Sequence, residues 1–143
     1  MKVLDVGCGS HKRGEVGVDV EPFAGVDYVV DLDKSPLPFP DNSFDTVCSH
    51  HFLEHLQHPE LAVREMVRVA KTNIIIIVPH RFSSYAKMKC HKSFLSKKWF
   101  LDVAKKLPVD ANVKSTFEPL IYFGFGIFSR PYELHVDFRK LTK

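Results

Sequence analysis

Apolar positions along the chain fall into short continuous runs separated by loops and by one stretch with helical spacing. Runs at residues 2–6, 15–20, 27–32 and 44–49 predict four strands, and the uninterrupted β-branched run at 73–78 predicts a fifth. A run of this last kind is usually covered on both faces, as in a central parallel strand. From Pro59, which suits a first helical turn, apolar residues recur at helical spacing, so 59–72 is predicted to be an amphipathic helix.

The second half of the chain has a less regular pattern. A helix is expected to begin at a cap formed by Ser93 or Ser96 and to end before Pro108. Residues 113–117 and 133–139 are expected to be strands, whereas the aromatic stretch 120–128 has no assignment. Prolines in 33–43 predict a loop. The alternation predicts an α/β domain spanning residues 1–143, with a mostly parallel sheet and ligands at the carboxyl ends of its strands.

Informative residues follow the first three predicted strands. Gly7 allows a tight turn, and Gly9 lets a ligand approach backbone N–H groups closely. Asp19, at the end of the second strand, can accept hydrogen bonds from both hydroxyls of a ribose, and Asp31 can accept from an adenine amino group. Each feature alone also fits a plain turn or a solvated loop carboxylate. Their occurrence at successive strand ends favours a nucleoside site.

The composition favours a folded globular protein over a membrane protein or a disulfide-rich secreted one. The 143 residues are 45% hydrophobic, which supports a packed core, and the longest apolar run is far shorter than a membrane span. No secretory signal is visible, and the three scattered cysteines do not suggest a disulfide framework. We therefore expect a cytoplasmic protein without membrane association. Residues 1–79 hold 7 basic against 12 acidic side chains and residues 80–143 hold 13 against 5, which suggests a basic working surface in the second half.

The motifs VLDVGCGS, GVDVEP and DLDKSPLPFPDNSFDTVCSHHFLEHL, within residues 2–80, resemble the S-adenosylmethionine-dependent methyltransferases, in particular the small type-11 group. The resemblance implies S-adenosyl-L-methionine as cofactor, with the glycine loop around its methionine part, Asp19 at the ribose and Asp31 at the adenine. No pyrophosphate has to be bound, so a third loop glycine is not needed. The expected cofactor-binding residues are Asp5, Gly7, Cys8, Gly9, Asp19, Val20, Asp31, Leu32 and Ser49.

The resemblance also implies a three-layer Rossmann-like fold with an antiparallel C-terminal strand. The chain departs from the family because it starts at the first strand, and residues 10–14 are too few for a helix before the second. Reduced helix cover is therefore expected on one face of the sheet. That face is a candidate surface for a homodimer.

Methyl transfer needs a nucleophile held close to the sulfonium and in line with the breaking bond, and a base where the nucleophile carries a proton. His50 and then His80 are the preferred catalytic candidates because they follow the fourth and fifth strands, and His51 is a third. Each also fits a structural loop histidine. No metal site is predicted: His51, His55 and His58 could share a helical face, but Cys90 and His91 would join them only by coincidence.

The basic, aromatic segment 80–106 suits RNA as well as an ordinary solvated helix face. The methyl acceptor is accordingly expected to be a small molecule or RNA. Two other functions remain open. One is an S-adenosylmethionine-binding module that acts as a sensor or partner subunit with weak catalysis. The other is an NAD-linked oxidoreductase, which the short glycine pattern disfavours.

Overall fold

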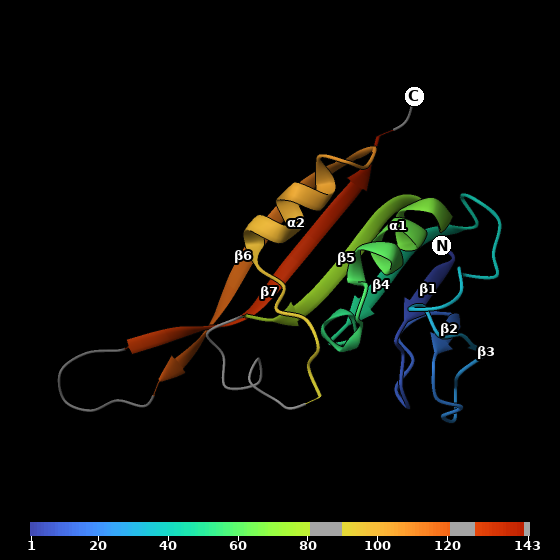
Figure 1. Cartoon of the computed structure of the whole chain (residues 1–143), viewed down its shortest axis with the longest axis horizontal. Coiled ribbons are helices and arrows are strands. Elements are labelled where there is room, and N and C mark those ends of the chain that lie inside the picture. Colours follow the sequence, from blue (N-terminus) through green and yellow to red (C-terminus); the bar gives the residue numbers. More distant parts are fainter. Residues whose placement is uncertain (81–89, 121–127, 142–143) are drawn as a thin grey trace.

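The structure, a computed structural model, describes residues 1–80, 90–120 and 128–141, without the side chains of 117–120 and 128–132. Figure 1 shows the arrangement of its elements. The strands are β1 (Val3–Val6), β2 (Val16–Asp19), β3 (Tyr28–Val29), β4 (Phe44–His50), β5 (Ala70–Pro79), β6 (Val109–Leu120) and β7 (Phe128–Lys140). The helices are the short 3-10 helix η1 (Leu53–His55), α1 (Pro59–Val69) and α2 (Lys97–Ala104). None of these described helices is long and apolar enough to cross a membrane.

The strands form one twisted sheet in the order β3-β2-β1-β4-β5-β7-β6. The five strands from β3 to β5 are parallel, and β7 pairs antiparallel with both β5 and β6. The predicted mostly parallel sheet with an antiparallel C-terminal strand is confirmed. Both C-terminal strands also extend beyond the predicted 113–117 and 133–139. Of the unassigned stretch, residues 121–127 lie outside the described part of the chain.

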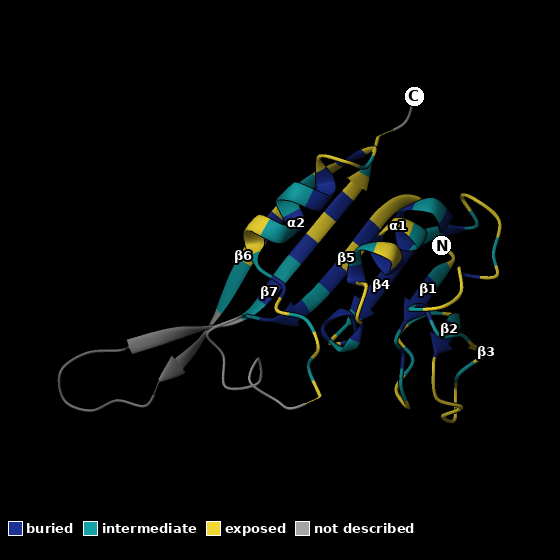
Figure 2. Cartoon of the chain, in the orientation of Figure 1, coloured by how far each residue is buried: buried dark blue, intermediate teal, exposed yellow. Residues whose placement is uncertain are grey.

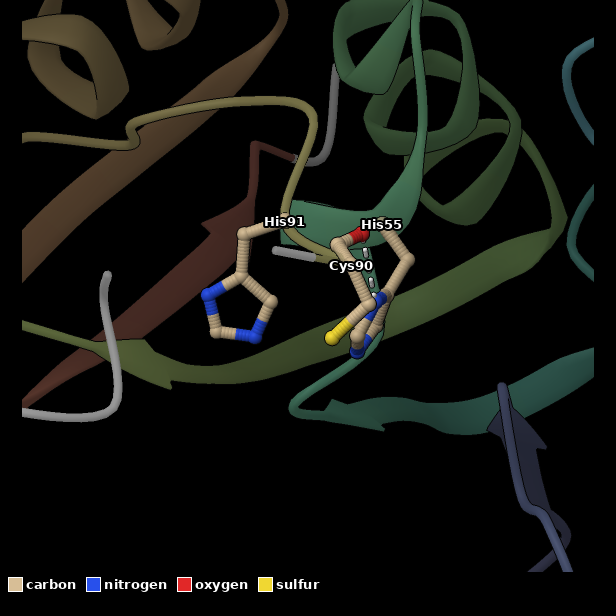
Figure 3. Close-up of side chains that lie close together, drawn as sticks. All are labelled: His55, Cys90 and His91. Atoms are coloured by element: carbon tan, nitrogen blue, oxygen red, sulfur yellow. Dashed lines mark hydrogen bonds between the residues drawn. The ribbon is translucent and has the colours of Figure 1, made fainter. Parts of the chain in front are cut away.

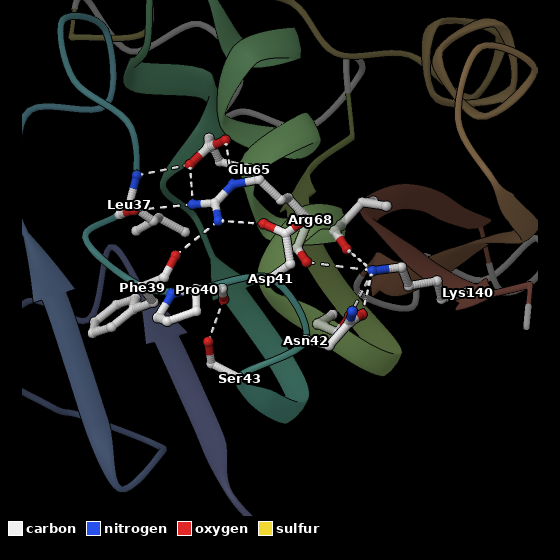
Figure 4. A network of polar contacts seen from close by, with 11 residues as sticks. Leu37, Phe39, Pro40, Asp41, Asn42, Ser43, Glu65, Arg68 and Lys140 are labelled. Carbon is white, nitrogen blue, oxygen red and sulfur yellow. Dashed lines mark hydrogen bonds and ion pairs between the residues drawn. The ribbon is translucent and has the colours of Figure 1, made fainter.

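The helix predicted over 59–72 ends three residues early, because contacts from distant segments satisfy its last carbonyls. Backbone N–H groups of Asn42 and Ser43 donate to the carbonyls of residues 68 and 69 at 3.0 and 2.8 Å. The Lys140 ammonium, at the end of β7, donates to the carbonyls of Val67 and Ala70, both at 2.9 Å, as Figure 4 shows. A cation at the C-terminal end of a helix also interacts favourably with the helix dipole. Ala70 is extended and starts β5.

Helix α2 begins directly after Ser96, one of the two serines predicted to cap it. The hydroxyl of Ser96 accepts a hydrogen bond from the backbone N–H of Trp99 at 3.1 Å, which satisfies one of the free donors at the helix start. Ser93 has another role, because its hydroxyl donates to the carbonyl of Leu56 at 2.8 Å. Ser93 therefore ties the segment before α2 to the turn before α1.

The two α-helices, α1 and α2, cover the same face of the sheet, as Figure 2 indicates. On β7, buried Val136 and Phe138 alternate with exposed Asp137 and Arg139, and Phe138 contacts the ring of Phe100 on α2. The opposite face has no helix among the described residues, and polar side chains occupy much of it. This alternation is typical of a sheet with one face in water. The predicted reduction of helix cover on one face is confirmed.

The proline-rich loop before β4, residues 33–43, is held by Arg68 of α1 (Figure 4). Its guanidinium donates to the carbonyls of Leu37 and Phe39 at 3.0 and 2.7 Å and forms ion pairs with Asp41 and Glu65. These carboxylates raise the pKa of Arg68 further above its ordinary range. The loop is therefore tied to α1 by charge-assisted hydrogen bonds.

Candidate functional site

Three turns at the carboxyl ends of β1, β2 and β3 are joined by hydrogen bonds. The N–H of Gly7 donates to the carbonyl of Val18 at 2.8 Å, and the N–H of Gly9 donates to the carboxylate of Asp19 at 2.9 Å. The carbonyl of Asp19 in turn accepts from the N–H of Val30 at 2.8 Å, one residue before Asp31. The glycine loop, Asp19 and Asp31 therefore lie along one edge of the sheet, as the sequence predicted.

The two loop glycines serve different purposes. Both have positive φ angles, +74° at Gly7 and +53° at Gly9, which disfavour other residues. A Cβ on Gly7 would stand 2.1 Å from the ring of Phe52, so Gly7 is needed for packing. A Cβ on Gly9 would meet no atom within 4 Å. The backbone at Gly9 therefore faces open space that a ligand can enter.

A cleft of about 390 Å³ opens beside these turns. It is lined by residues that follow four strands: Val20, Asp31, Leu32, Asp33, Lys34, Phe52, His55, Leu56, Gln57, His58, Cys90 and Lys92. This volume lies in the range of small-molecule and cofactor sites. Three of the predicted cofactor residues, Val20, Asp31 and Leu32, stand in its wall. Hydrogen bonding to Lys34 holds the pKa of Asp31 below its ordinary value, so the carboxylate remains an acceptor.

Asp33, which the sequence reasoning did not single out, joins two walls of this cleft. Its carboxylate accepts from the backbone N–H groups of Gln57 and His58 at 3.0 and 2.9 Å. These donors lie just before α1, whose own preceding residue makes no side-chain cap. Asp33 therefore fixes the turn that leads into α1 from a distant loop. No local pattern reveals this, because the partners are 24 and 25 residues apart.

Several other predicted cofactor residues are buried behind the glycine loop. Asp5 is fully buried, and its carboxylate accepts from the N–H of Arg13 at 2.7 Å and faces the Cys48 thiol at 3.6 Å. Burial, together with Asp5, raises the pKa of Cys8 to about 11 and that of Cys48 to about 12. These thiols are therefore neutral and unreactive at physiological pH. The hydroxyl of Ser49 is buried with no hydrogen-bond partner among the described residues.

The predicted catalytic histidines stand at the ends of β4 and β5. His50 is half-buried, and burial lowers its pKa below the ordinary value, with a further contribution from the charge of Arg13. His80 directly follows β5 and is also half-buried. His51 has a φ angle of +51°, which is rare for a residue with a side chain. Such backbone strain often accompanies a functional role.

His51 lies between two glutamates that the sequence reasoning missed. Its Nε2 is 2.8 Å from Glu133 on β7, and its Nδ1 is 3.5 Å from Glu54 on η1. The Glu54 carboxylate is buried, without a hydrogen-bond partner among the described residues. Both carboxylates raise the pKa of His51 above its ordinary value. Glu133 also contacts His135 at 3.1 Å. Glu133 is 82 positions from His51, so spacing in the sequence could not reveal that part of the group.

Known methyltransferases resemble this chain in sequence over part of its length. A family model described as a methyltransferase domain matches residues 10–78. The ajmaline N-methyltransferase of Rauvolfia serpentina is 34% identical over 100 residues, a match that covers 53% of this chain and 34% of the plant enzyme. The chain therefore spans about a third of that relative's length.

Solved structures share the fold. A methyltransferase of Thermotoga maritima, described as a possible histamine N-methyltransferase, superposes with a TM-score of 0.73 at 17% identity, over 98% of this chain and 82% of the other. The magnesium protoporphyrin IX methyltransferase of Synechocystis, solved with bound S-adenosylmethionine, gives 0.63 at 12% identity, over 99% and 70%. The chain is therefore similar to methyltransferase domains over residues 10–78, just under half of its length, and it shares the fold of solved S-adenosylmethionine-dependent methyltransferases.

Proposed function

We propose that residues 1–143 act as one domain that binds S-adenosylmethionine and transfers its methyl group to a small-molecule amine. The observation that carries the first part is the row of turns at one sheet edge, in which Gly9 is hydrogen-bonded to Asp19 and the neighbouring Val20 and Asp31 line a cleft of about 390 Å³. The open space in front of Gly9 and the carboxylate acceptor of Asp31 on the cleft wall support binding of a polar ligand such as this cofactor.

Each part of the cofactor has a suitable partner. Val20 and Leu32 offer apolar contacts to the adenosine, and Asp31 accepts hydrogen bonds at its polar edge. Each oxygen of Asp19 already accepts one backbone N–H and keeps a lone pair for a ribose hydroxyl. The space in front of Gly9 would take the methionine part. When bound, S-adenosylmethionine supplies an electrophilic methyl group on a sulfonium.

The acceptor would lie beside the ends of β4 and β5. Because its pKa is lowered, His50 is neutral near pH 7 and suited to take a proton from an attacking amine. The carboxylates of Glu54 and Glu133 favour a cationic acceptor. His51 would hold these carboxylates and so position the end of β4 relative to β7. Two of the compared proteins are described by N-methyltransferase names, which supports a nitrogen acceptor.

The test is transfer of a labelled methyl group from S-adenosylmethionine to a panel of primary and secondary amines. His50→Ala should lower turnover at saturating cofactor by about 10²–10⁴-fold, the usual contribution of a general base. Lys71→Ala, at an exposed position near the start of β5 and outside the cleft lining, serves as the control and should retain turnover. Unchanged turnover in His50→Ala would remove that residue from the mechanism.

A binding module without efficient catalysis is the second candidate. The short connection at residues 10–14 and the sheet face without a described helix favour it. Binding of S-adenosylhomocysteine without methyl transfer to any amine or RNA in the panel would support the module and contradict the enzyme. RNA is added to the panel of amines because Phe94 is 69% exposed near the exposed lysines 97 and 98.

A further inference from the structure

Three side chains that can each bind a metal ion, His55, Cys90 and His91, lie close together, and the first and second of them line the cleft (Figure 3). His55 ends η1, and Cys90 and His91 lie in the segment before α2. Each of the three residues offers one ligand atom, and these atoms all lie within 4.8 Å of one another. The ring centroids of His55 and His91 are 4.9 Å apart, with the rings edge to face. We propose that His55, Cys90 and His91 bind a Zn²⁺ ion.

The protonation state of His55 suits a metal ligand. Its Nδ1 lies 3.3 Å from the backbone carbonyl oxygen of Cys90. A carbonyl can only accept, so Nδ1 carries the proton and donates it. The lone pair is then on Nε2, on the opposite side of the ring. Metal-binding histidines commonly have their second nitrogen fixed in this way by a carbonyl or carboxylate.

Backbone hydrogen bonds hold the segment that carries Cys90 and His91 against η1, which carries His55. N–H groups of Lys92 and Ser93 donate to the carbonyl of Glu54 at 2.8 and 3.1 Å, next to His55. The hydroxyl of Ser93 adds the bond to Leu56. Ligand atoms of a tetrahedral zinc ion stand about 3.5 Å apart, given bond lengths near 2.0–2.3 Å. The ligand atoms would therefore have to approach one another by about 1 Å, and the exposed Cys90 and half-buried His91 have the least packing around their side chains to oppose this.

The donor set selects the class of metal. Two imidazoles and a thiolate suit Zn²⁺ and related transition metals, whereas Mg²⁺ and Ca²⁺ require oxygen ligands. Three protein ligands leave one tetrahedral position for water or another ligand, which is the arrangement of open zinc sites. His55 and Cys90 line the cleft, so this position would face the same space as the proposed cofactor site. The ion would also pin the segment 90–93 to η1.

Direct metal binding tests the site independently of methyl transfer. The whole chain, without any histidine tag, is titrated with Co²⁺ alone, and bound Zn²⁺ is then measured by its displacement of Co²⁺. We expect one Co²⁺ per chain, with a thiolate-to-cobalt absorption band and d–d bands of tetrahedral intensity. Zn²⁺ should abolish both.

Variants connect the signal to the named residues. Cys90→Ser should remove the thiolate band, and His91→Ala should weaken Zn²⁺ binding at least tenfold. His58→Ala removes a nearby imidazole of the same cleft and should bind as the unaltered chain does. Circular dichroism confirms that each variant is folded, which is expected because Cys90 is exposed and His91 half-buried. Absence of a thiolate band, or equal Zn²⁺ affinity in Cys90→Ser, would overturn the proposal.

Discussion

The two glycines of the first loop provide a matched pair of perturbations. Gly7→Ala and Gly9→Ala add the same methyl group to residues that both have positive φ angles. An L-residue in this region costs roughly 1–2 kcal/mol, and the reduced freedom of the unfolded chain offsets about 0.4–1 kcal/mol in both variants. These contributions are similar in the two variants and largely cancel in their comparison.

The surroundings of the two glycines differ. The methyl group at Gly7 would lie 2.1–2.4 Å from three carbons of Phe52, far inside ordinary contact, and backbone or ring must shift. Overpacking of this kind adds about 1–3 kcal/mol. The methyl group at Gly9 meets nothing within 4 Å. Gly7→Ala should therefore be the less stable variant by about 1–3 kcal/mol, a substantial part of a typical total of about 5–15 kcal/mol.

Urea unfolding gives the two stabilities, and calorimetric titration with S-adenosylhomocysteine gives the affinity of Gly9→Ala. That variant should lose only the net backbone cost of about 0–1.6 kcal/mol in stability. It should lose at least tenfold in affinity, about 1.4 kcal/mol, because its methyl group enters the space proposed for the ligand. Equal destabilisation by both substitutions would refute the packing argument at Phe52. Full affinity in Gly9→Ala would refute the placement of the ligand in front of this residue.

Three further substitutions test the scaffold around the site. Ser96→Ala removes the cap of α2 and should lower the unfolding free energy by about 1 kcal/mol in urea titrations; no change would contradict the cap. Arg68→Met removes the donors to two loop carbonyls and should lower the free energy of unfolding by about 1–3 kcal/mol in the same urea titrations. An unchanged urea midpoint would contradict this role of Arg68. His51 has a raised pKa, so its stabilisation is complete below about pH 6.5 and is lost as pH rises through its folded pKa. The stability difference between the unaltered chain and His51→Gln should therefore shrink from pH 6 to pH 9, and a difference that grows would contradict the pairing with two carboxylates.

The parallel part of the sheet was predictable because its signals are local. Continuous apolar runs mark the strands, and glycine or aspartate follows where each strand ends. In a parallel sheet those ends meet at one edge, so the position of Gly9 near Asp19 follows from pattern alone. The antiparallel pairing of the C-terminal strands required the family resemblance, since antiparallel order is not visible in either strand by itself.

Features that depend on long-range contacts were not predictable in this way. The end of α1 at Val69 is fixed by Lys140, about 70 residues away. His51 meets Glu133 across 82 positions, so the carboxylate–imidazole group appears only after β5 and β7 pair. Cys90 and His91 likewise reach His55 because backbone hydrogen bonds return their segment to η1. Spacing in the sequence indicated no metal site, whereas the fold brings three ligands together.

The central claim is that three adjoining turns together bind an adenosyl ligand through the carboxylate of Asp19. Calorimetric titration of the whole chain and of Asp19→Ala with S-adenosylhomocysteine tests it most directly. The account predicts one site per chain, no binding of NAD under the same conditions, and an affinity loss of about 1–3 kcal/mol in the variant. An affinity that does not change when the carboxylate is removed, or no binding to the unaltered chain, would contradict it.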